Sequence, residues 1–590
     1  MKSVVLYLVA SFCLLLSSIA RDQPNIIVIF TDDHGWPDVG AAGIYEDLKT
    51  PNIDQLAADG ARCTNGYVTA PQCVPSRGGL LAGRDQSRFG LETNGSGLEG
   101  FNAEVTIAER MKAAGYATGQ IGKWHLGSVK EIPSHGFDDV FAKHSAQPGW
   151  ANFGLDGSDE EPGFEETGMY HLDACSAAAT AFIDRHSEEP FFLYLAYRAP
   201  HVPLDAPEKK LYRFTGKIPE RRRQALGIIS AMDDGIGAVR AKLVEKELTG
   251  KTLIFFIGDN GAPLKIHKVD APGGGPGWDG SLNVPMNGEK GMLSEGGIRV
   301  PYIVAWPGRI PAGQVFDKPV SSLDVAATSV AISGAGSSEL LDGVNVVPHL
   351  AGEVKGVPHE VLFWRWSGQS AIREGNWKLL IGGAREYLYD IVADPGETTN
   401  LMTKHPEVAE RLRKRLAGWT QELNPPGFIK GMATAWERYF DHYLDGKTVS
   451  SKEAATLDPP AVSGWIARNA ELKVKDGKLR VHDLNGKARL SPFIANNQVK
   501  LKGPFRIRIP AVLADSKGEV SIAWRISGEK DFDAVNAVTM TKNAAGEYEA
   551  LVPAEETVIH LRVRLPEGNA TIGGIVVESS EGELMQRFRF

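Results

Sequence analysis

The chain carries no excess of positive charge and lacks a long apolar interior segment. Its formal net charge is −9, and only Arg221–Arg223 form a basic run. Because nucleic-acid affinity depends on clustered lysine and arginine that displace counterions, this charge argues against a nucleic-acid partner. The basic run lies in a helical pattern, so we expect it to form a solvated helix face rather than a binding patch.

The N-terminal stretch resembles a signal peptide. It begins with Lys2, is apolar from Val4 to Leu16, and ends with small residues. We expect residues 1–20 to be removed, the protein to be secreted or periplasmic, and the mature chain to have no membrane contact. A retained membrane anchor is the alternative, although the apolar run is short for a span.

Cysteine is scarce, with four residues in the chain of 590. Cys13 leaves with the predicted signal peptide, and three cysteines remain, an odd number for an oxidising compartment. Cys63 and Cys175 can pair or stay buried and reduced, and the sequence favours neither. Cys73 needs a separate explanation.

The first part of the chain alternates buried strands with helices. Residues 25–31 form an apolar, β-branched run typical of a strand buried on both faces, and similar runs recur at 191–196 and 252–257. The pattern predicts an α/β domain at residues 21–335, with a large mixed, mostly parallel sheet flanked by helices. The helical segments are 53–59, 106–114 and 222–248.

The pattern changes after residue 335. We expect a smaller α+β subdomain at residues 336–445, with strands at 361–366 and 377–381 and helices at 406–423 and 432–444. A polar stretch separates it from an appended all-β, sandwich-like domain at residues 460–590. The strands expected there are 479–481, 505–509, 520–526 and 558–563.

Acidic residues follow two of the predicted central strands. Asp32 and Asp33 come after residues 25–31, and Asp259 and Asn260 come after residues 252–257. The carboxyl ends of parallel strands form the edge where ligands bind. An all-oxygen set of three carboxylates and an amide suits Ca²⁺ or Mg²⁺ rather than zinc. Taken alone, either pair is more often a turn or a helix cap.

The segment CVPSR, from Cys73 to Arg77, predicts a tight turn that enters a helix. The backbone N–H groups and the dipole of such a helix favour an anion at residue 73. Arg77, one turn further on, can return to the same place. By its residue type alone, Cys73 is either a thiol nucleophile or an inert buried cysteine.

Three further segments carry basic side chains. In GKWHLG, Lys123 and His125 are two residues apart, so in an extended segment both face one side while Trp124 faces the other. His201 follows the predicted strand 191–196, and Lys290 stands in GEKG. Taken alone, such histidines are more often structural, and such a lysine is more often solvated.

Together these motifs resemble the formylglycine-dependent sulfatase family of the alkaline phosphatase superfamily. CVPSR is similar to the family signature whose cysteine is oxidised to formylglycine by a dedicated generating enzyme. The resemblance covers about residues 25–445, whereas the all-β tail lies outside it. The other matching blocks, in the expected order, are NIIVIFTDDHGW, GKWHLG, FFLYLAYRAPHVPLDAP, FFIGDNG and GEKGMLSEGGIRVPYIVAWPG.

The resemblance implies a sulfatase with one Ca²⁺ ion and a formylglycine made from Cys73. One hydroxyl of the hydrated aldehyde would attack sulfur, and the second would later expel sulfate by reforming the carbonyl. The implied metal ligands are Asp32, Asp33, Asp259, Asn260 and an oxygen of the converted Cys73.

The resemblance also implies roles for the basic residues. Lys123 would contact the sulfate and the hydrated aldehyde, and Arg77 would help the metal to acidify the attacking hydroxyl. His125 would be the base for sulfate release. His201 and Lys290 match residues that hold sulfate and protonate the leaving oxygen.

The substrate is the least defined expectation. The segment RWSGQSAIREGNWKLL, the predicted secretion and the β domain resemble bacterial secreted polysaccharide sulfatases, so we expect a sulfated glycan or oligosaccharide. The alternative is a phosphodiesterase or phosphonate monoester hydrolase of the same superfamily, since such enzymes use a similar site. A decayed, non-catalytic carbohydrate-binding relative is disfavoured, because it should have lost at least one costly buried charge.

Overall fold

The computed structural model groups the described residues into two compact units. The first contains the described parts of Met1–Ala199, Ile229–Ala262 and Leu282–Lys447, and the second contains those of Pro200–Ile228, Pro263–Ser281 and Thr448–Phe590. The predicted signal peptide lies outside the described residues and stays a prediction, as do the domain boundaries. The structure describes residues 23–590 except 145–148, 203, 205, 216–217, 268–279, 337–338, 426–435, 448–462, 469, 484–491, 497–498, 514–517 and 527–535.

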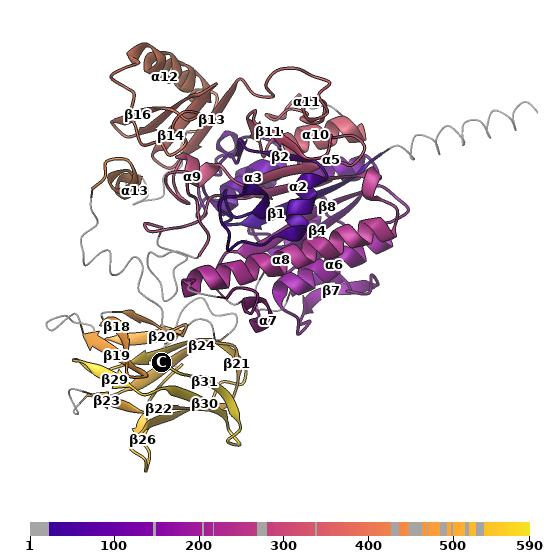
Figure 1. The fold of residues 1–590 in the computed structure, drawn as a ribbon. Coiled ribbons are helices and arrows are strands. Elements are labelled where there is room, and N and C mark those ends of the chain that lie inside the picture. The colour runs from indigo at the N-terminus through magenta and orange to yellow at the C-terminus, as the bar shows by residue number, and fades with distance from the viewer. Residues whose placement is uncertain are drawn as a thin grey trace, which may run out of the picture. The chain divides into compact units, whose positions relative to one another are not determined.

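A ten-stranded mixed sheet forms the centre of the first unit (Figure 1). Its middle strand β1, Asn25–Asp32, is buried along its whole length, as the apolar run predicts. β1 pairs in parallel with β9, and β4 pairs in parallel with both β8 and β5. The order is β11 (Gln314–Phe316), β2 (Ala61–Cys63), β10 (Tyr302–Ala305), β9 (Thr252–Gly258), β1, β8 (Phe191–Pro200), β4 (Ala117–Gly122), β5 (Asp139–Ala142), β6 (Gly149–Phe153) and β7 (Asp159–Glu165).

Helices cover both faces of this sheet, which confirms the predicted α/β class. The helices α6 and α8 lie on one side, and α5 and α10 lie on the other (Figure 1). Among the described residues, no helix combines the length and apolar character that a bilayer crossing requires. The main helices are α2 (Pro51–Ala58), α3 (Cys73–Ala82), α5 (Ile107–Ala113), α6 (His171–Arg185), α8 (Glu220–Glu245) and α10 (Asp324–Ser333).

The strand register brings three chain segments to the same edge of the sheet. Thr31 of β1 lies opposite Gly258 of β9, so the residues that follow both strands emerge side by side. Gly122 of β4 lies opposite Ala196 of β8, and the Lys123 N–H donates to the Ala196 carbonyl at 2.8 Å. The polar residues after β1, β9 and β4 therefore gather at one carboxyl edge.

A smaller antiparallel sheet follows in the first unit, as the expected α+β subdomain predicts. Its four strands are β13 (Val361–Trp366), β14 (Gln369–Glu374), β15 (Trp377–Gly382) and β16 (Arg385–Asp390). The helix α12, Pro406–Thr420, packs on this sheet, where Leu412 and Leu416 join buried side chains of β14, β15 and β16. Another helix, α13, spans Trp436–Tyr443.

The C-terminal residues form the predicted all-β domain. Three antiparallel sheets share one buried core that includes Trp465, Phe505 and Leu561. The first sheet contains β17 (Ile466–Arg468), β20 (Phe493–Asn496), β28 (Thr557–Arg564), β24 (Ser521–Ile526), β25 (Ala537–Thr539) and β21 (Leu501–Lys502). The other two contain β18 (Ala470–Lys475), β19 (Lys478–Asp483), β29 (Ala570–Ile572) and β23 (Ala511–Leu513), and β26 (Thr541–Lys542), β27 (Tyr548–Val552), β22 (Phe505–Ile509), β30 (Ile575–Ser579) and β31 (Leu584–Phe588).

The basic run on α8 differs from its prediction. Arg221 and Arg222 are only 5% and 2% exposed, so the expectation of a solvated face is wrong for both. The Arg222 guanidinium donates to the Gly280 carbonyl at 3.3 Å, and that of Arg223 donates to the Phe214 carbonyl. Arginine can be buried when backbone carbonyls accept its N–H groups, which a charge pattern does not reveal.

Gly122 is predicted to tolerate no side chain. Its φ is 94°, and an added Cβ would lie 2.2 Å from the Ala196 carbonyl oxygen that accepts the Lys123 N–H. Gly115 is the matched control, because its φ is 86° and nothing lies near an added Cβ. Both alanine variants should lose about 1–2 kcal/mol to the left-handed backbone, and Gly122→Ala should lose about 1–3 kcal/mol more from the clash. Equal unfolding free energies in urea would contradict the predicted clash.

Candidate active site

Three buried carboxylates meet at the carboxyl edge of the large sheet. Asp32 ends β1, Asp33 follows it, and Asp259 follows β9, and all three have no solvent exposure. With the Cys73 sulfur, one ligand atom of each lies within 4.8 Å of all the others. The backbone of Asp33 has a left-handed φ of 59°, a strain that persists only where the surroundings impose it. Like charges so close together require compensation by a cation.

Asn260 completes an oxygen donor set. Its amide nitrogen donates to Asp33 at 2.7 Å and to the Gly261 carbonyl at 2.9 Å. Its amide oxygen is buried and has no hydrogen-bond partner among the described residues. An orphaned buried oxygen beside carboxylates is a fitting ligand for a hard divalent cation such as Ca²⁺.

Three basic side chains pair with the three carboxylates. The Lys123 Nζ lies 2.7 Å from Asp32, and the Lys290 Nζ lies 2.9 Å from Asp33. The Arg77 guanidinium lies 2.7 Å from Asp259. Each of these basic side chains is at most 6% exposed, so the charges act on one another with little screening by water.

Cys73 begins α3 and faces the carboxylates. Its sulfur lies 3.4 Å from Asp32 and 3.9 Å from Asp33. The next backbone N–H, from Val74, donates to the Asn94 side chain at 3.0 Å, which holds the start of the helix. The predicted turn into a helix is therefore confirmed, and residue 73 lies at the positive end of the helix dipole.

Burial and charge shift the ionisation of these groups. Burial, followed by the Asp259 carboxylate, raises the pKa of the Cys73 thiol well above its usual value. Burial and the Asp32 carboxylate raise the pKa of Asp259 to about 6, against the opposing effect of Arg77. Burial alone would lower the pKa of Arg77, but Tyr194, Asp259 and Asp32 raise it above its ordinary value, so the guanidinium stays charged.

The segment around Lys123 is not extended in the way we expected. Lys123 and Trp124 are both buried, whereas His125 is exposed and has a left-handed φ of 64°. The left-handed residue ends the extended segment, so the alternation of side chains does not by itself place His125 on the same face as Lys123. The structure brings Lys123 into the carboxylate cluster and leaves His125 accessible to solvent.

His201 belongs to the second compact unit. It follows β8 directly, as expected, and its Nδ1 lies 2.7 Å from the Val202 carbonyl oxygen. His201 as a whole residue is 9% exposed. Its catalytic role stays a prediction.

Sequence reasoning missed Tyr194 and Asn94. The Tyr194 hydroxyl accepts a hydrogen bond from Arg77 at 3.2 Å, and Asn94 holds the start of α3. A tyrosine inside the otherwise apolar run FFLYLA was a usable signal, because a buried hydroxyl needs a partner. Asn94 had no such signal, since its loop has no regular pattern.

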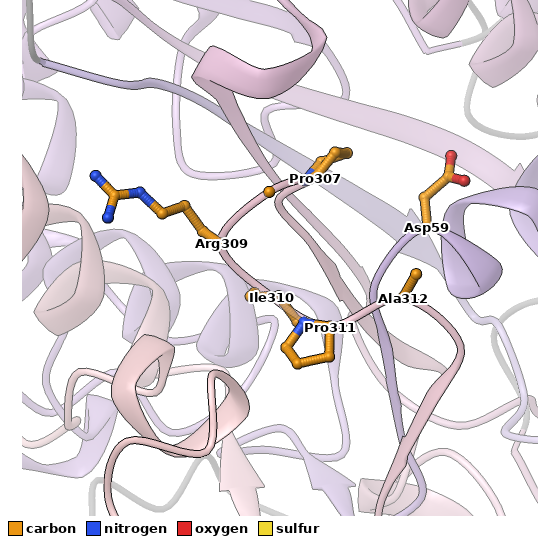
Figure 2. A pocket seen from close by; sticks show the side chains of 7 residues that line it. Asp59, Pro307, Arg309, Ile310, Pro311 and Ala312 are labelled. Atoms are coloured by element: carbon orange, nitrogen blue, oxygen red, sulfur yellow. The ribbon is translucent and has the colours of Figure 1, made fainter.

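A surface hollow lies away from this cluster. It has a volume of about 440 Å³ and is lined by Asp59 and by residues 307–312 (Figure 2). These residues follow α2 and β10, and β10 runs antiparallel to β9. The hollow therefore lies at the opposite edge of the sheet and contains none of the predicted site residues.

Known proteins are similar to this chain in sequence. The profile of the family described as Sulfatase matches residues 24–335, and that described as N-sulphoglucosamine sulphohydrolase, C-terminal, matches residues 288–422. The N-acetylgalactosamine-6-sulfatase of Sus scrofa is 31% identical over 425 residues, covering 66% of this chain and 78% of the relative.

Two solved structures are also similar. The crystal structure of Ps i-CgsB in complex with k-i-k-neocarrahexaose has a TM-score of 0.61 and 29% identity, covering 73% of this chain and 99% of that chain. The phosphonate monoester hydrolase of Agrobacterium radiobacter has a TM-score of 0.52 and 20% identity, covering 68% and 96%. The second similarity concerns the fold alone.

The ion pair between Arg77 and Asp259 yields a stability prediction. Asp259→Ala should lower the unfolding free energy by about 3–5 kcal/mol, because Arg77 would stay buried with only the longer ion pair to Asp32 at 3.7 Å. Asp184→Ala is the control, since its side chain is 49% exposed beside Lys246, and it should cost at most about 1 kcal/mol. Urea unfolding in a chelating buffer measures both, and similar losses would contradict the prediction.

Proposed function

Because this chain belongs to the sulfatase family, we propose that it hydrolyses the sulfate esters of a sulfated carbohydrate through a formylglycine made from Cys73. The chain is a sulfuric ester hydrolase by its family. The observation that carries the proposal is the position of Cys73, which begins α3 beside Asp32 and Asp33. A nucleophile made there would lie between a cation site and the positive end of a helix.

We propose that one Ca²⁺ ion binds at the carboxylate cluster. When bound, the ion would act as a Lewis acid that polarises a sulfate oxygen and lowers the pKa of the neighbouring hydroxyl. The orphaned Asn260 oxygen and the all-oxygen set support calcium over zinc. The ligands would be Asp32, Asp33, Asp259, Asn260 and an oxygen of converted residue 73.

Converted to formylglycine, residue 73 would supply a hydrated aldehyde, with one hydroxyl to attack sulfur and a second to reform the carbonyl as sulfate leaves. A serine could not complete the second step, because it has no second hydroxyl. The generating enzyme that oxidises the cysteine is the maturation partner in this proposal.

The three basic side chains would then bind the sulfate group. With a divalent cation at the carboxylates, the charges of Arg77, Lys123 and Lys290 are no longer fully balanced by Asp32, Asp33 and Asp259, and the cluster gains two positive charges. A sulfate ester and the charge that develops on its leaving oxygen would compensate this excess. Arg77 and Lys123 would face the residue 73 side, and Lys290 would face the leaving oxygen.

The two histidines would move the protons. His125 is exposed, so its ring can exchange a proton with water, which suits the base that deprotonates the second hydroxyl. His201 would hold sulfate and, together with Lys290, donate a proton to the leaving oxygen.

The proposal of a carbohydrate substrate is supported by the substrates named for similar proteins. The similar N-acetylgalactosamine-6-sulfatase and the structure in complex with k-i-k-neocarrahexaose favour a sulfated glycan or oligosaccharide. A phosphodiesterase or phosphonate monoester hydrolase is the second candidate, because such an enzyme shares the fold. The lysine at 123 beside a histidine at 125 resembles sulfatases more closely.

The function is tested by comparing substrates on chain co-produced with a formylglycine-generating enzyme. Sulfated monosaccharides should be hydrolysed with kcat/KM at least about 100-fold above that for an aryl phosphodiester, a discrimination that differences in pocket contacts can supply. Peptide mass spectrometry should find residue 73 with oxygen in place of sulfur and two hydrogens fewer. Cys73→Ala should fold and be inactive. Full activity with an unmodified Cys73, or faster phosphodiester hydrolysis, would contradict the proposal.

The metal is tested separately. Elemental analysis should find one calcium per chain, and added Ca²⁺ should raise the melting temperature of chelated protein, because binding to the folded state alone stabilises it. Asn260→Ala should weaken this response, whereas Asn152→Ala, on β6 and away from the cluster, should respond like wild type. Bound zinc, or full activity after exhaustive chelation, would count against calcium.

A further inference from the structure

Lys290 lies on a segment without regular secondary structure. Its Nζ lies 2.9 Å from Asp33, although residues 289–294 are neither strand nor helix. We call residues 289–295 the Lys290 segment. Because no helix or sheet ladder fixes this backbone, individual hydrogen bonds must set the position of the lysine.

The near side of the segment is bound to the large α/β domain. The Lys290 N–H donates to the Ala262 carbonyl at 3.2 Å, and the Gly291 N–H donates to the Pro71 carbonyl at 2.9 Å. Ala262 comes shortly after β9, and Pro71 comes shortly before α3. These bonds join the segment to the chain just before Cys73 and just after Asp259.

The far side of the segment is bound to the small antiparallel sheet. Gln369, the first residue of β14, is fully buried, and its amide uses both of its ends. Its nitrogen donates to the Gly291 carbonyl at 2.9 Å, and its oxygen accepts the Leu293 N–H at 3.0 Å. A side-chain amide offers a donor and an acceptor in one plane, so it can replace a strand partner here.

Glu397 holds the end of the segment. Its carboxylate accepts the Glu295 N–H at 2.7 Å, where the short helix α9, Glu295–Ile298, begins. Lys378 of β15 lies 2.9 Å from Glu295 and 3.0 Å from Glu397, and all three side chains are buried. Glu397 has a left-handed φ of 49°, so the chain bears backbone strain to present this carboxylate.

We propose that Gln369 and Glu397 are positioning residues for Lys290, which hold its segment so that the lysine reaches the sulfate group of the substrate. This inference rests on the proposed function, in which Lys290 contacts sulfate and the leaving oxygen. Neither residue touches the substrate in this proposal. The small sheet thus serves the reaction although it supplies no catalytic group.

Hydrogen exchange tests whether Gln369 stabilises the Lys290 segment, and the measurement does not require enzyme activity. Gln369→Met keeps the side-chain volume and removes both hydrogen bonds, so amide exchange within residues 289–295 should quicken by about 10-fold or more, as local opening costs less. Peptides from β1 and α3 should exchange as in wild type. Glu374→Gln is the control on the same strand, since Glu374 pairs with Arg411, and it should leave the segment unchanged. Unchanged exchange in Gln369→Met would overturn the proposal.

A double-mutant cycle tests whether Gln369 affects catalysis by positioning Lys290. In the mature enzyme, Gln369→Met should lower kcat/KM for a sulfated sugar by on the order of 100-fold, the effect of a small displacement of a catalytic group. In a Lys290→Ala background the same change should cost less than about 3-fold, because the lysine that it displaces is already absent. A merely structural role would give equal losses in both backgrounds, and that result would overturn the proposal.

A second variant covers a failure to fold. If Gln369→Met does not fold, Glu397→Ala replaces it in both measurements, because it removes the acceptor of the Glu295 N–H. Exchange within residues 289–295 should again quicken, and the loss of kcat/KM should again depend on Lys290. Unchanged exchange, or equal losses in both backgrounds, would overturn the proposal. Wild-type protein that hydrolyses no sulfate ester would contradict the proposed function only. In that case the exchange data alone decide whether the segment is held by Gln369 and Glu397.

Discussion

The compensation of three buried carboxylates is the constraint on which the site depends. Asp32, Asp33 and Asp259 lie too close together to stay ionised without positive partners. Lys123, Lys290 and Arg77 supply those partners, and each approaches from a different part of the chain. In the proposed function, the same charges that make the fold tolerate the cluster would bind a sulfate group once a divalent cation is present.

The two halves of this arrangement are built differently. The carboxylates stand at the ends of β1 and β9, where the ladder of a fully buried sheet fixes the backbone. Lys290 stands on irregular backbone and depends on single hydrogen bonds from other elements, among them those of Gln369. The sheet hydrogen bonds fix the position of a side chain on a strand. The position of a side chain on a loop depends instead on the individual contacts that its backbone makes with neighbouring elements.

Much of the fold could be predicted from local patterns. The apolar run at 25–31 and the run at 252–257 form β1 and β9, since a short, continuous β-branched stretch bounded by polar residues is typical of a buried strand. CVPSR became the start of α3. The prediction of a solvated arginine face was wrong, because Arg221 is buried. The expected extended conformation ends at His125, whose backbone is left-handed.

The sequence by itself determined which side chains are available and at which strand ends they stand, because burial and period are local properties. Only the tertiary structure decided which charges pair. The partners of Asp32, Asp259 and Asp33 are 91, 182 and 257 residues away along the chain. No periodic pattern spans such separations, so the pairing of Lys123, Arg77 and Lys290 follows from strand order and from the loops that the small sheet holds in place.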